Sequence, residues 1–298
     1  MSSDVVPSAP PSFRQLLDSA GLIVAPGAYD AITARLVEQA GFPLVYMTGA
    51  GTAAARGYPD YGLLTMTEMV ENAAVLARSV AVPVLADADT GFGNELNVTR
   101  TVREYETRGV AGIHLEDQVS PKRCGHLDGK QVIDRARFTS LVAAAVEARA
   151  SSDFVVVART DAVATEGLDE AIDRANAALD VGADVAFVEA LTTIDEVAAV
   201  PTRVHGPCLL NIVPGGKTPV NDLTDVASMG YRIALCPGLL LGATVMVGDI
   251  VLKELAETNR HPSSGKGSVG DFFARFGGAE WDDIRRRFAD DESAAARP

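Results

Sequence analysis

Residues 82–117 read VPVLADADTGFGNELNVTRTVREYETRGVAGIHLED, and this stretch decides the predicted fold. Its two ends, Val82 to Asp89 and Ala111 to Asp117, have the length and apolar content of buried strands. Between them, Glu95 to Arg108 has a helical pattern that Gly109 terminates. A strand, a helix and a second strand in this order predict one parallel β–α–β unit.

The same alternation continues on both sides of this unit. Further helical patterns occur at Thr67 to Val80, Phe138 to Ala150 and Leu168 to Val181. The other strand-like runs are LIVAPG from Leu22, PLVYMTG from Pro43, FVVVARTD from Phe154, VAFVEA from Val185, CLLNIV from Cys208 and RIALCPG from Arg232. With the two runs of the opening stretch they predict an α/β protein whose parallel strands close into a (β/α)8 TIM barrel. An open doubly wound sheet is the structural alternative.

The length of 298 residues and the hydrophobic content of 47% suit one barrel domain. We expect a flexible leader at residues 1–12, the barrel with a C-terminal helical extension at residues 13–288, and a flexible tail at residues 289–298. The chain shows neither a signal-peptide pattern nor an apolar run of bilayer length, so the prediction is a cytoplasmic protein without a membrane partner. The 3 cysteines are too scattered for a disulfide framework, which predicts free thiols.

The formal net charge of −14 indicates which classes of binding partner are disfavoured. A strongly negative field repels phosphates, so nucleic acid and anionic membranes are disfavoured. A small anionic substrate would then need local cations or a metal ion at its site.

Polar side chains occupy the predicted C-terminal strand ends, which is where barrel enzymes place their active sites. These residues are Tyr46, Thr48, Gly49, Asp87, Asp89, His114, Glu116, Asp117, Arg159, Asp161, Glu189 and Asn211. We expect them to converge on one mouth of the barrel.

Asp87 and Asp89 lie two residues apart on what reads as an extended strand, so their side chains are expected to point the same way. Carboxylates held close together repel each other unless a cation neutralises them. This favours Mg²⁺, or Mn²⁺, bound directly by Asp87 and through water by Asp89 and Glu116. The alternative is that these acids only cap a helix or pair with lysine and arginine.

The stretch EDQVSPKRCGH, which follows the fourth strand, reads as a loop that covers the site. Its cations Lys122 and Arg123 are expected to lower the pKa of Cys124, which would make the thiol able to exchange protons; the alternative is a solvated basic loop with an inert thiol. Arg159 ends a buried strand and suits a substrate carboxylate, or else an ion pair with Glu189.

Together, DADTGFGN, LEDQVSPKRCGH, VARTDA and the strand that ends at Asn211 resemble the isocitrate lyase and phosphoenolpyruvate mutase superfamily. GAYDAITARL and YMTGAG extend the resemblance over roughly residues 13 to 288. It implies a barrel whose eighth helix is exchanged with a neighbouring subunit, in a homotetramer built as a dimer of dimers.

The resemblance also implies roles for individual residues. Mg²⁺ would lie at Asp87, supported by Asp89 and Glu116, and a closing loop would carry Lys122 and Cys124. The substrate-binding residues would be Thr48, Gly49, Gly125, His126, Arg159, Glu189 and Asn211. We expect Cys124 to protonate the departing carbanion, Tyr46 to orient the substrate hydroxyl, and Asp60 to be a weaker catalytic candidate.

Within the superfamily, KRCGH is similar to the lyase branch. This favours cleavage of a carbon–carbon bond in a small 2-hydroxy di- or tricarboxylate, of the 2-methylisocitrate or 2,3-dimethylmalate type, to pyruvate or glyoxylate and a second acid. NIVPGGKTP around Asn211 resembles dimethylmalate lyase and oxaloacetate hydrolase relatives instead. The alternatives are therefore an oxaloacetate hydrolase or decarboxylase, a phosphonopyruvate-type enzyme, and a metabolite-binding barrel without catalysis.

Overall fold

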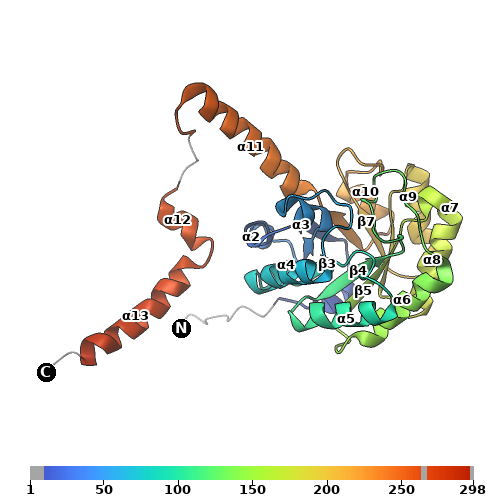
Figure 1. The fold of residues 1–298 in the computed structure, drawn as a ribbon, viewed down its shortest axis with the longest axis horizontal. Helices are drawn as coiled ribbons and strands as arrows, with labels where there is room; N and C mark the ends of the chain where they lie inside the picture. Colours follow the sequence, from blue (N-terminus) through green and yellow to red (C-terminus); the bar gives the residue numbers. More distant parts are fainter. Residues whose placement is uncertain (1–9, 263–266, 296–298) are drawn as a thin grey trace. The chain divides into compact units, whose positions relative to one another are not determined.

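The computed structural model describes residues 10–262 and 267–295. Within them, parallel strands form a closed barrel in the order β1 to β8, with β8 hydrogen-bonded back to β1 (Figure 1). The closure confirms the predicted barrel and excludes the open sheet. The strands are β1 (Ile23–Ala28), β2 (Val45–Met47), β3 (Val84–Asp87), β4 (Gly112–Glu116), β5 (Val155–Thr160), β6 (Val185–Val188), β7 (Cys208–Asn211) and β8 (Ile233–Cys236).

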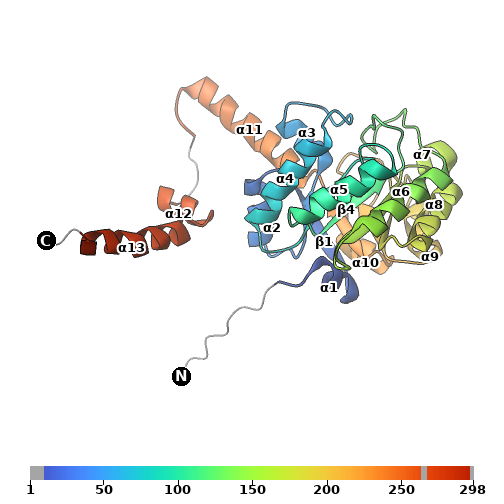
Figure 2. The ribbon, with the colours of Figure 1, turned by 60° about the horizontal axis from the view of Figure 1, so that its bottom comes forward.

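Helices cover the outside of the barrel, and Figure 2 shows α4, α5 and α6 side by side along it. The four helices predicted from the sequence correspond to α4, α5, α6 and α8, with ends that agree to within one turn. The helices before β8 are α1 (Phe13–Asp18), α2 (Ala31–Gln39), α3 (Gly49–Ala55), α4 (Met66–Ser79), α5 (Glu95–Thr107), α6 (Arg135–Ala148), α7 (Val163–Glu166), α8 (Leu168–Asp180), α9 (Ile194–Arg203) and α10 (Leu223–Ser228).

The interior of the barrel is apolar at one end and polar at the other. Phe13 and Leu16 of α1 pack among inward-facing strand residues such as Leu85, Val157 and Phe187, which closes the N-terminal end of the barrel. The Ser12 side chain caps α1, so it belongs to the barrel although the sequence analysis assigned it to the leader. Residues 1–9 of that leader lie outside the described part of the chain.

The chain divides into two compact units between Thr244 and Val245. The division falls within α11 (Leu239–Thr258), and the second unit also contains α12 (Val269–Ala274) and α13 (Gly278–Ala295). α13 thus includes most of the segment predicted as a tail, while residues 296–298 lie outside the described part. Among the helices that the structure describes, none has both the length and the apolar character needed to cross a membrane.

Arg174 of α8 fastens the outer helices to the end of β4. Its side chain is 2% exposed, and its Nη1 donates to Asp117 Oδ2 at 3.1 Å and to the backbone oxygen of Ile133 at 2.6 Å. Asp117 also accepts hydrogen bonds from the Thr160 hydroxyl and the Asp161 backbone amide. The expected position of Asp117 at the mouth is therefore wrong, because these bonds hold its carboxylate between β5 and α8.

We predict that Arg174→Met destabilises the fold by roughly 3–5 kcal/mol, because it leaves the Asp117 carboxylate buried without its cation. Chemical denaturation measures the free energy of unfolding. Arg203→Met is the matched control, since Arg203 pairs with Asp169 on the surface and its loss should change stability little. Equal effects of the two substitutions would contradict the assigned role of Arg174.

Candidate active site

A cavity of about 230 Å³ lies at the C-terminal end of the strands and brings together most of the predicted site residues. The predicted residues that line it are Tyr46, Thr48, Asp60, Asp87, Cys124, Gly125, His126, Arg159, Glu189 and Asn211. Gly49, Asp89, Glu116 and Lys122 are buried or packed directly behind this lining. The remaining lining residues were not predicted from the sequence; they are Ala50, Val213, Pro237, Gly238 and Leu241.

Asp87 ends β3 at the base of the cavity, where neighbouring groups fix its carboxylate. Oδ1 accepts a hydrogen bond from the Asp89 backbone amide at 2.9 Å, and Oδ2 lies 3.5 Å from the Tyr46 hydroxyl. Gly49 begins α3 against this carboxylate, and a side chain there would place Cβ 2.3 Å from Oδ2. Glycine at position 49 therefore allows the start of α3 to approach Asp87.

Thr48 lines the cavity, and hydrogen bonds tie it to β1 and to the start of α3. Its backbone amide donates to the backbone oxygen of Ala28 at 3.0 Å, and its side chain accepts from the Gly51 amide at the start of α3. The Thr48 amide therefore already serves the barrel backbone and is not free to donate to a substrate oxygen.

His114 and Tyr46 form a buried polar pair beside Asp87. The Tyr46 hydroxyl lies 2.9 Å from Nε2 of His114. Burial, together with the positive charges of Arg159 and Lys122, lowers the pKa of His114 to about 3, so its imidazole is neutral. Burial and the Asp87 carboxylate raise the pKa of Tyr46, which keeps the phenol protonated. This pair therefore supplies neutral hydrogen-bonding groups next to a charged carboxylate.

Asp89 lies just beyond β3 and faces a buried lysine. Its φ of 45° places it in the left-handed region, so the extended-strand geometry expected for it is wrong. Lys122 Nζ lies 3.0 Å from Asp89 Oδ1 and also binds Asp60. Burial alone would lower the pKa of Lys122, but the carboxylates of Asp89, Asp87, Glu116 and Asp60 raise it well above its usual value. The lysine therefore stays charged and joins the loop to the carboxylate cluster.

Glu116 ends β4 with two buried carboxylate oxygens that accept no hydrogen bond from any residue in the described part of the chain. Arg159 Nη1 lies 3.4 Å from Oε2, which is an ion-pair distance. Burial raises the pKa of Glu116 well above its usual value, against the opposing charges of Arg159 and Lys122. A buried carboxylate without hydrogen bonds is costly, so this position suits a cation or its water ligands.

These three carboxylates fit a hydrated hard cation better than a closed metal cage. No cluster of three or more His, Cys, Asp or Glu side chains with direct metal-binding geometry occurs among the described residues. Mg²⁺ commonly uses one or two carboxylates and keeps several waters. Asp87 as a direct ligand, with Asp89 and Glu116 accepting from waters, is compatible with that chemistry. Asp89 also pairs with Lys122, and Glu116 pairs with Arg159. The alternative prediction, that these acids pair with lysine and arginine, is therefore correct in part.

The environment of Cys124 corrects a prediction. Burial and the nearby Asp60 carboxylate raise the pKa of this thiol, although the His126 backbone amide, Arg159 and Lys122 act in the opposite direction. The expected lowering is wrong because burial outweighs the effect of the neighbouring cations on the pKa of Cys124. Cys124 is therefore a protonated thiol at the cavity, the form that a proton donor requires.

Arg159 is held by a neighbouring acid on its own strand end. Its Nε and Nη2 donate to Asp161 at 2.9 and 3.2 Å, and its guanidinium lies over the Phe187 ring. The Arg159 and Lys130 charges hold the pKa of Asp161 below its usual value against the effect of burial. The predicted alternative partner, Glu189, instead accepts hydrogen bonds from His126 and Asn211.

His126 connects two loops above the cavity. Nε2 lies 2.9 Å from Glu189 Oε1, while Nδ1 accepts from the Lys217 backbone amide at 3.0 Å, which makes Nε2 the protonated nitrogen. Lys217 also pairs with Asp128 at 2.7 Å. The GGKTP segment thus contacts the KRCGH loop, which its similarity to relatives did not predict.

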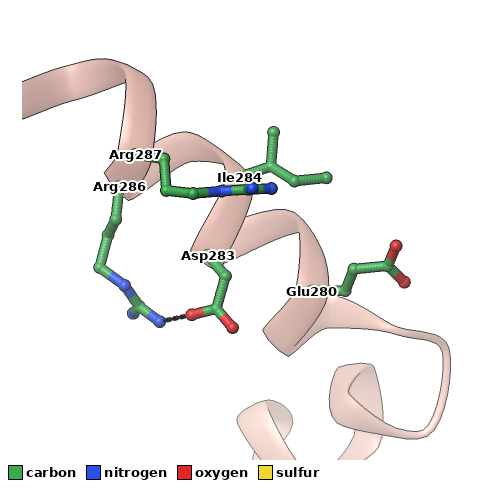
Figure 3. Close-up of a pocket in the computed structure, with 5 residues that line it drawn as sticks. All are labelled: Glu280, Asp283, Ile284, Arg286 and Arg287. Carbon is green, nitrogen blue, oxygen red and sulfur yellow. Dashed lines mark hydrogen bonds and ion pairs between the residues drawn. The ribbon is translucent and has the colours of Figure 1, made fainter. Parts of the chain in front are cut away.

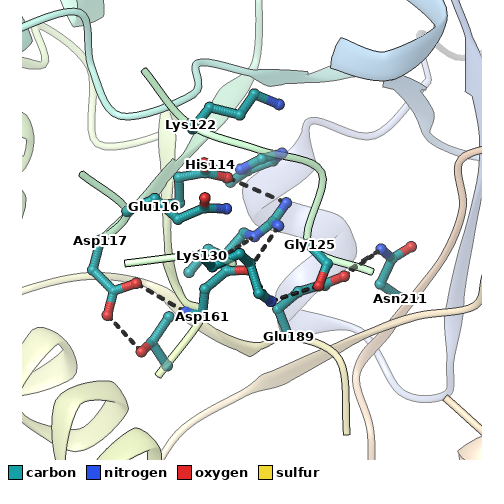
Figure 4. A network of polar contacts seen from close by, with 12 residues as sticks. His114, Glu116, Asp117, Lys122, Gly125, Lys130, Asp161, Glu189 and Asn211 are labelled. Atoms are coloured by element: carbon teal, nitrogen blue, oxygen red, sulfur yellow. Dashed lines mark hydrogen bonds and ion pairs between the residues drawn. The ribbon is translucent and has the colours of Figure 1, made fainter. Parts of the chain in front are cut away.

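Lys130 is a site residue that sequence reasoning missed. Its side chain is 1% exposed and contacts both Gly125 and Asp161 (Figure 4). The DGK turn that contains it gives no periodic signal, and a lysine in a polar loop is normally exposed. Only the three-dimensional course of the loop identifies it.

Comparisons with known proteins identify the family of this chain. The family model described as phosphoenolpyruvate phosphomutase matches residues 13–254. The chain belongs to the PEP mutase/isocitrate lyase superfamily. Its relatives include a 2,3-dimethylmalate lyase of Eubacterium barkeri, 47% identical over 75% of this chain and 78% of the relative. A 2-methylisocitrate lyase of Aeropyrum pernix is 41% identical over 82% of this chain and 79% of the relative.

Solved structures from the superfamily have the same fold. Oxaloacetate acetylhydrolase bound to 3,3-difluorooxalacetate aligns with a TM-score of 0.88 at 36% identity, over 97% of this chain and 98% of that chain. A phosphonopyruvate hydrolase complex with oxalate and Mg²⁺ aligns with a TM-score of 0.84 at 31% identity, over 93% and 97% of the two chains. The superfamily assignment therefore rests on both sequence and structure.

A larger hollow on α13 does not have the features of an active site (Figure 3). It is lined by Glu280, Asp283, Ile284, Arg286 and Arg287. Arg286 forms an ion pair with Asp283 of the same helix. These residues lie along a single helix, whereas the barrel cavity collects residues from several strands and loops.

We predict that Gly125→Ala weakens anion binding, because the added Cβ would lie 2.4 Å from Arg159 Nη2 and 2.6 Å from Glu189 Cγ. Displacing these groups should lower the affinity for oxalate in the presence of Mg²⁺ by roughly tenfold or more. Isothermal titration calorimetry measures this affinity. Wild-type affinity in the variant would show that the close approach of the loop to Arg159 is unimportant.

Proposed function

We propose that this superfamily member is a Mg²⁺-dependent carbon–carbon lyase that cleaves a 2-hydroxy dicarboxylate of the 2,3-dimethylmalate type. The observation that carries the proposal is that Cys124, Arg159 and Asp87 line one cavity. Cys124 supplies a protonated thiol and Arg159 a guanidinium held in place by Asp161. Asp87 supplies a carboxylate in the cluster that suits a cation. The products would be pyruvate and propionate.

The metal site of the proposal consists of Asp87, with Asp89 and Glu116 behind it. Mg²⁺, or Mn²⁺ in its place, would supply positive charge for the substrate carboxylate and adjacent hydroxyl and would favour loss of the hydroxyl proton. The unpartnered oxygens of Glu116 support this assignment, as does the Mg²⁺ named in the phosphonopyruvate hydrolase complex.

The chain's own residues divide the remaining work. Arg159 and the Asn211 amide line the cavity and would hold the second carboxylate. Tyr46 orients the hydroxyl, and Lys122 keeps Asp60 and Asp89 in place. When the bond between the hydroxyl-bearing carbon and its neighbour breaks, the first carbon becomes the 2-oxo carbon of pyruvate. The electron pair stays on the neighbouring carbon, which takes the Cys124 proton and becomes propionate. The proton lost from the hydroxyl passes to water, and water returns one proton to the Cys124 thiolate.

The charge and the apolar lining of the cavity favour a dicarboxylate over a tricarboxylate. Of the described residues that line this cavity, Arg159 is the single lysine or arginine, and the lining also includes the carboxylates of Asp60 and Glu189. A metal ion and one guanidinium account for two carboxylates, and a third would have no cation. Ala50, Val213 and Leu241 instead offer apolar contacts that suit methyl groups.

We also propose a homotetramer with an exchanged eighth helix. α11, which follows β8, contains no buried residue, and its Val245, Met246, Ile250 and Leu252 are exposed. In α12 and α13, Phe272, Phe273 and Trp281 are exposed as well. Apolar helices of this kind normally pack against another surface, and a second subunit would supply it.

The proposal predicts that purified protein with Mg²⁺ converts 2,3-dimethylmalate to pyruvate and propionate, and that EDTA abolishes the reaction. The kcat/KM for 2-methylisocitrate should be lower by about tenfold or more, because its third carboxylate lacks a cation. Mass spectrometry identifies the products.

Equal kcat/KM values for the two acids would contradict the dicarboxylate assignment. Formation of acetate and oxalate from oxaloacetate, without cleavage of either hydroxy acid, would replace the lyase by a hydrolase, for which the oxaloacetate acetylhydrolase fold is the precedent.

A further inference from the structure

The base of the loop after β4 is closed by backbone hydrogen bonds. The Val119 amide donates to Gln131 at 2.8 Å, the Ile133 amide donates to Asp117 at 2.9 Å, and Gln118 faces Val132 in an antiparallel bridge. Lys130 therefore leaves the backbone at a fixed position at the foot of the loop. Cys124 and Gly125 lie in the part of the loop between the two segments that these hydrogen bonds join.

Lys130 crosses the inside of this loop from its foot to the segment that carries Cys124. Its Nζ donates to the Gly125 backbone oxygen at 2.5 Å and to Asp161 Oδ1 at 2.8 Å. Gly125 directly follows Cys124, and Asp161 directly holds Arg159. The Lys130 ammonium group thus joins the backbone next to Cys124 to the Asp161 carboxylate, which orients the guanidinium of Arg159 (Figure 4).

Lys130 is buried and its ammonium group has two defined partners, which distinguishes it from an ordinary surface lysine. An ammonium group is expensive to bury and persists where charged and hydrogen-bonded partners compensate. One partner, Gly125, lines the cavity, while the other, Asp161, follows β5 and holds Arg159, which lines the cavity. Gly125 also lacks room for a Cβ against Arg159 and Glu189, so small movements of the loop change the cavity directly.

A second set of hydrogen bonds holds the backbone on the other side of Cys124. The Gln118 side chain donates to the Arg123 backbone oxygen at 2.8 Å and accepts from the Arg123 amide at 3.0 Å. Gln118 therefore fixes the residue before Cys124, and Lys130 fixes the residue after it. Of these two residues, Lys130 is the one that also reaches Arg159, the proposed substrate-binding arginine, through Asp161.

We propose that Lys130 is a positioning residue that holds Cys124 over the cavity by tying the Gly125 carbonyl to Asp161. The inference rests on the proposed function, in which Cys124 delivers the proton. Lys130 itself does not line the cavity, so it acts through the loop and through Asp161.

The test is a double-mutant cycle with Lys130→Met and Cys124→Ser, measured on 2,3-dimethylmalate cleavage in the full-length enzyme. Lys130→Met should lower kcat by about 10- to 100-fold with a smaller change in KM, because the thiol is misplaced. In the Cys124→Ser background, the same substitution should lower kcat by less than about threefold, since the group it positions is already lost.

Arg149→Met is the matched control. Arg149 pairs with Asp184 at 2.8 Å at the opposite, N-terminal end of the strands, so its loss removes a half-buried ion pair far from the cavity. It should lower the thermal unfolding temperature and leave kcat unchanged in both backgrounds. If Lys130→Met does not fold, Lys130→Gln replaces it, because glutamine keeps one donor and should give a milder loss that again depends on Cys124.

The outcomes separate the inference from the proposed function. Wild-type kcat in Cys124→Ser alone would overturn the proton-donor role of Cys124, and with it the proposed mechanism. A large loss in Cys124→Ser with wild-type kcat in Lys130→Met would overturn the inference alone. Equal losses from Lys130→Met in both backgrounds would place its effect on Arg159 or on stability rather than on Cys124, and would likewise overturn the inference.

Discussion

The repulsion among buried carboxylates at the mouth of the barrel is the constraint on which the site depends. Asp87, Asp89, Glu116, Asp161 and Glu189 are all buried there, in a region of low dielectric where like charges interact strongly. Among the described residues, the buried cations at this mouth are Lys122, Arg159 and Lys130. These cations offset only part of the negative charge, and both Glu116 oxygens lack hydrogen bonds within the described chain. A divalent cation completes this balance in our account.

The same burial determines the state of the proton donor. The loop after β4 brings Cys124 to the cavity, but it also removes the thiol from water and commits Lys122 to carboxylates. The raised pKa of Cys124 keeps the thiol in its acid form, which suits protonation of a carbanion better than the thiolate that the basic loop predicts. Lys130 and Gln118 then fix the backbone on either side of it.

The sequence predicts the barrel because each β–α unit carries a local signal. All of the predicted strands occur, and their polar last residues meet at one end because parallel strands share a direction. What the sequence could not predict depends on contacts between distant segments. The left-handed turn at Asp89, the burial of Lys130 and the bond of the Thr48 amide to Ala28 all arise from how loops meet around the closed barrel. The apolar residues Val213 and Leu241 line the cavity for the same reason, since neither has a composition that distinguishes it from core.

Titration of the protein with Mn²⁺, followed by electron paramagnetic resonance, tests the central claim most directly. The account predicts one tightly bound Mn²⁺ per chain in the wild-type protein, a large loss of affinity in Asp87→Asn, and normal binding in the surface control Asp169→Asn. Oxalate should change the Mn²⁺ spectrum of the wild-type protein. Wild-type Mn²⁺ affinity in Asp87→Asn would contradict the claim that the carboxylates of this mouth are arranged around a metal ion.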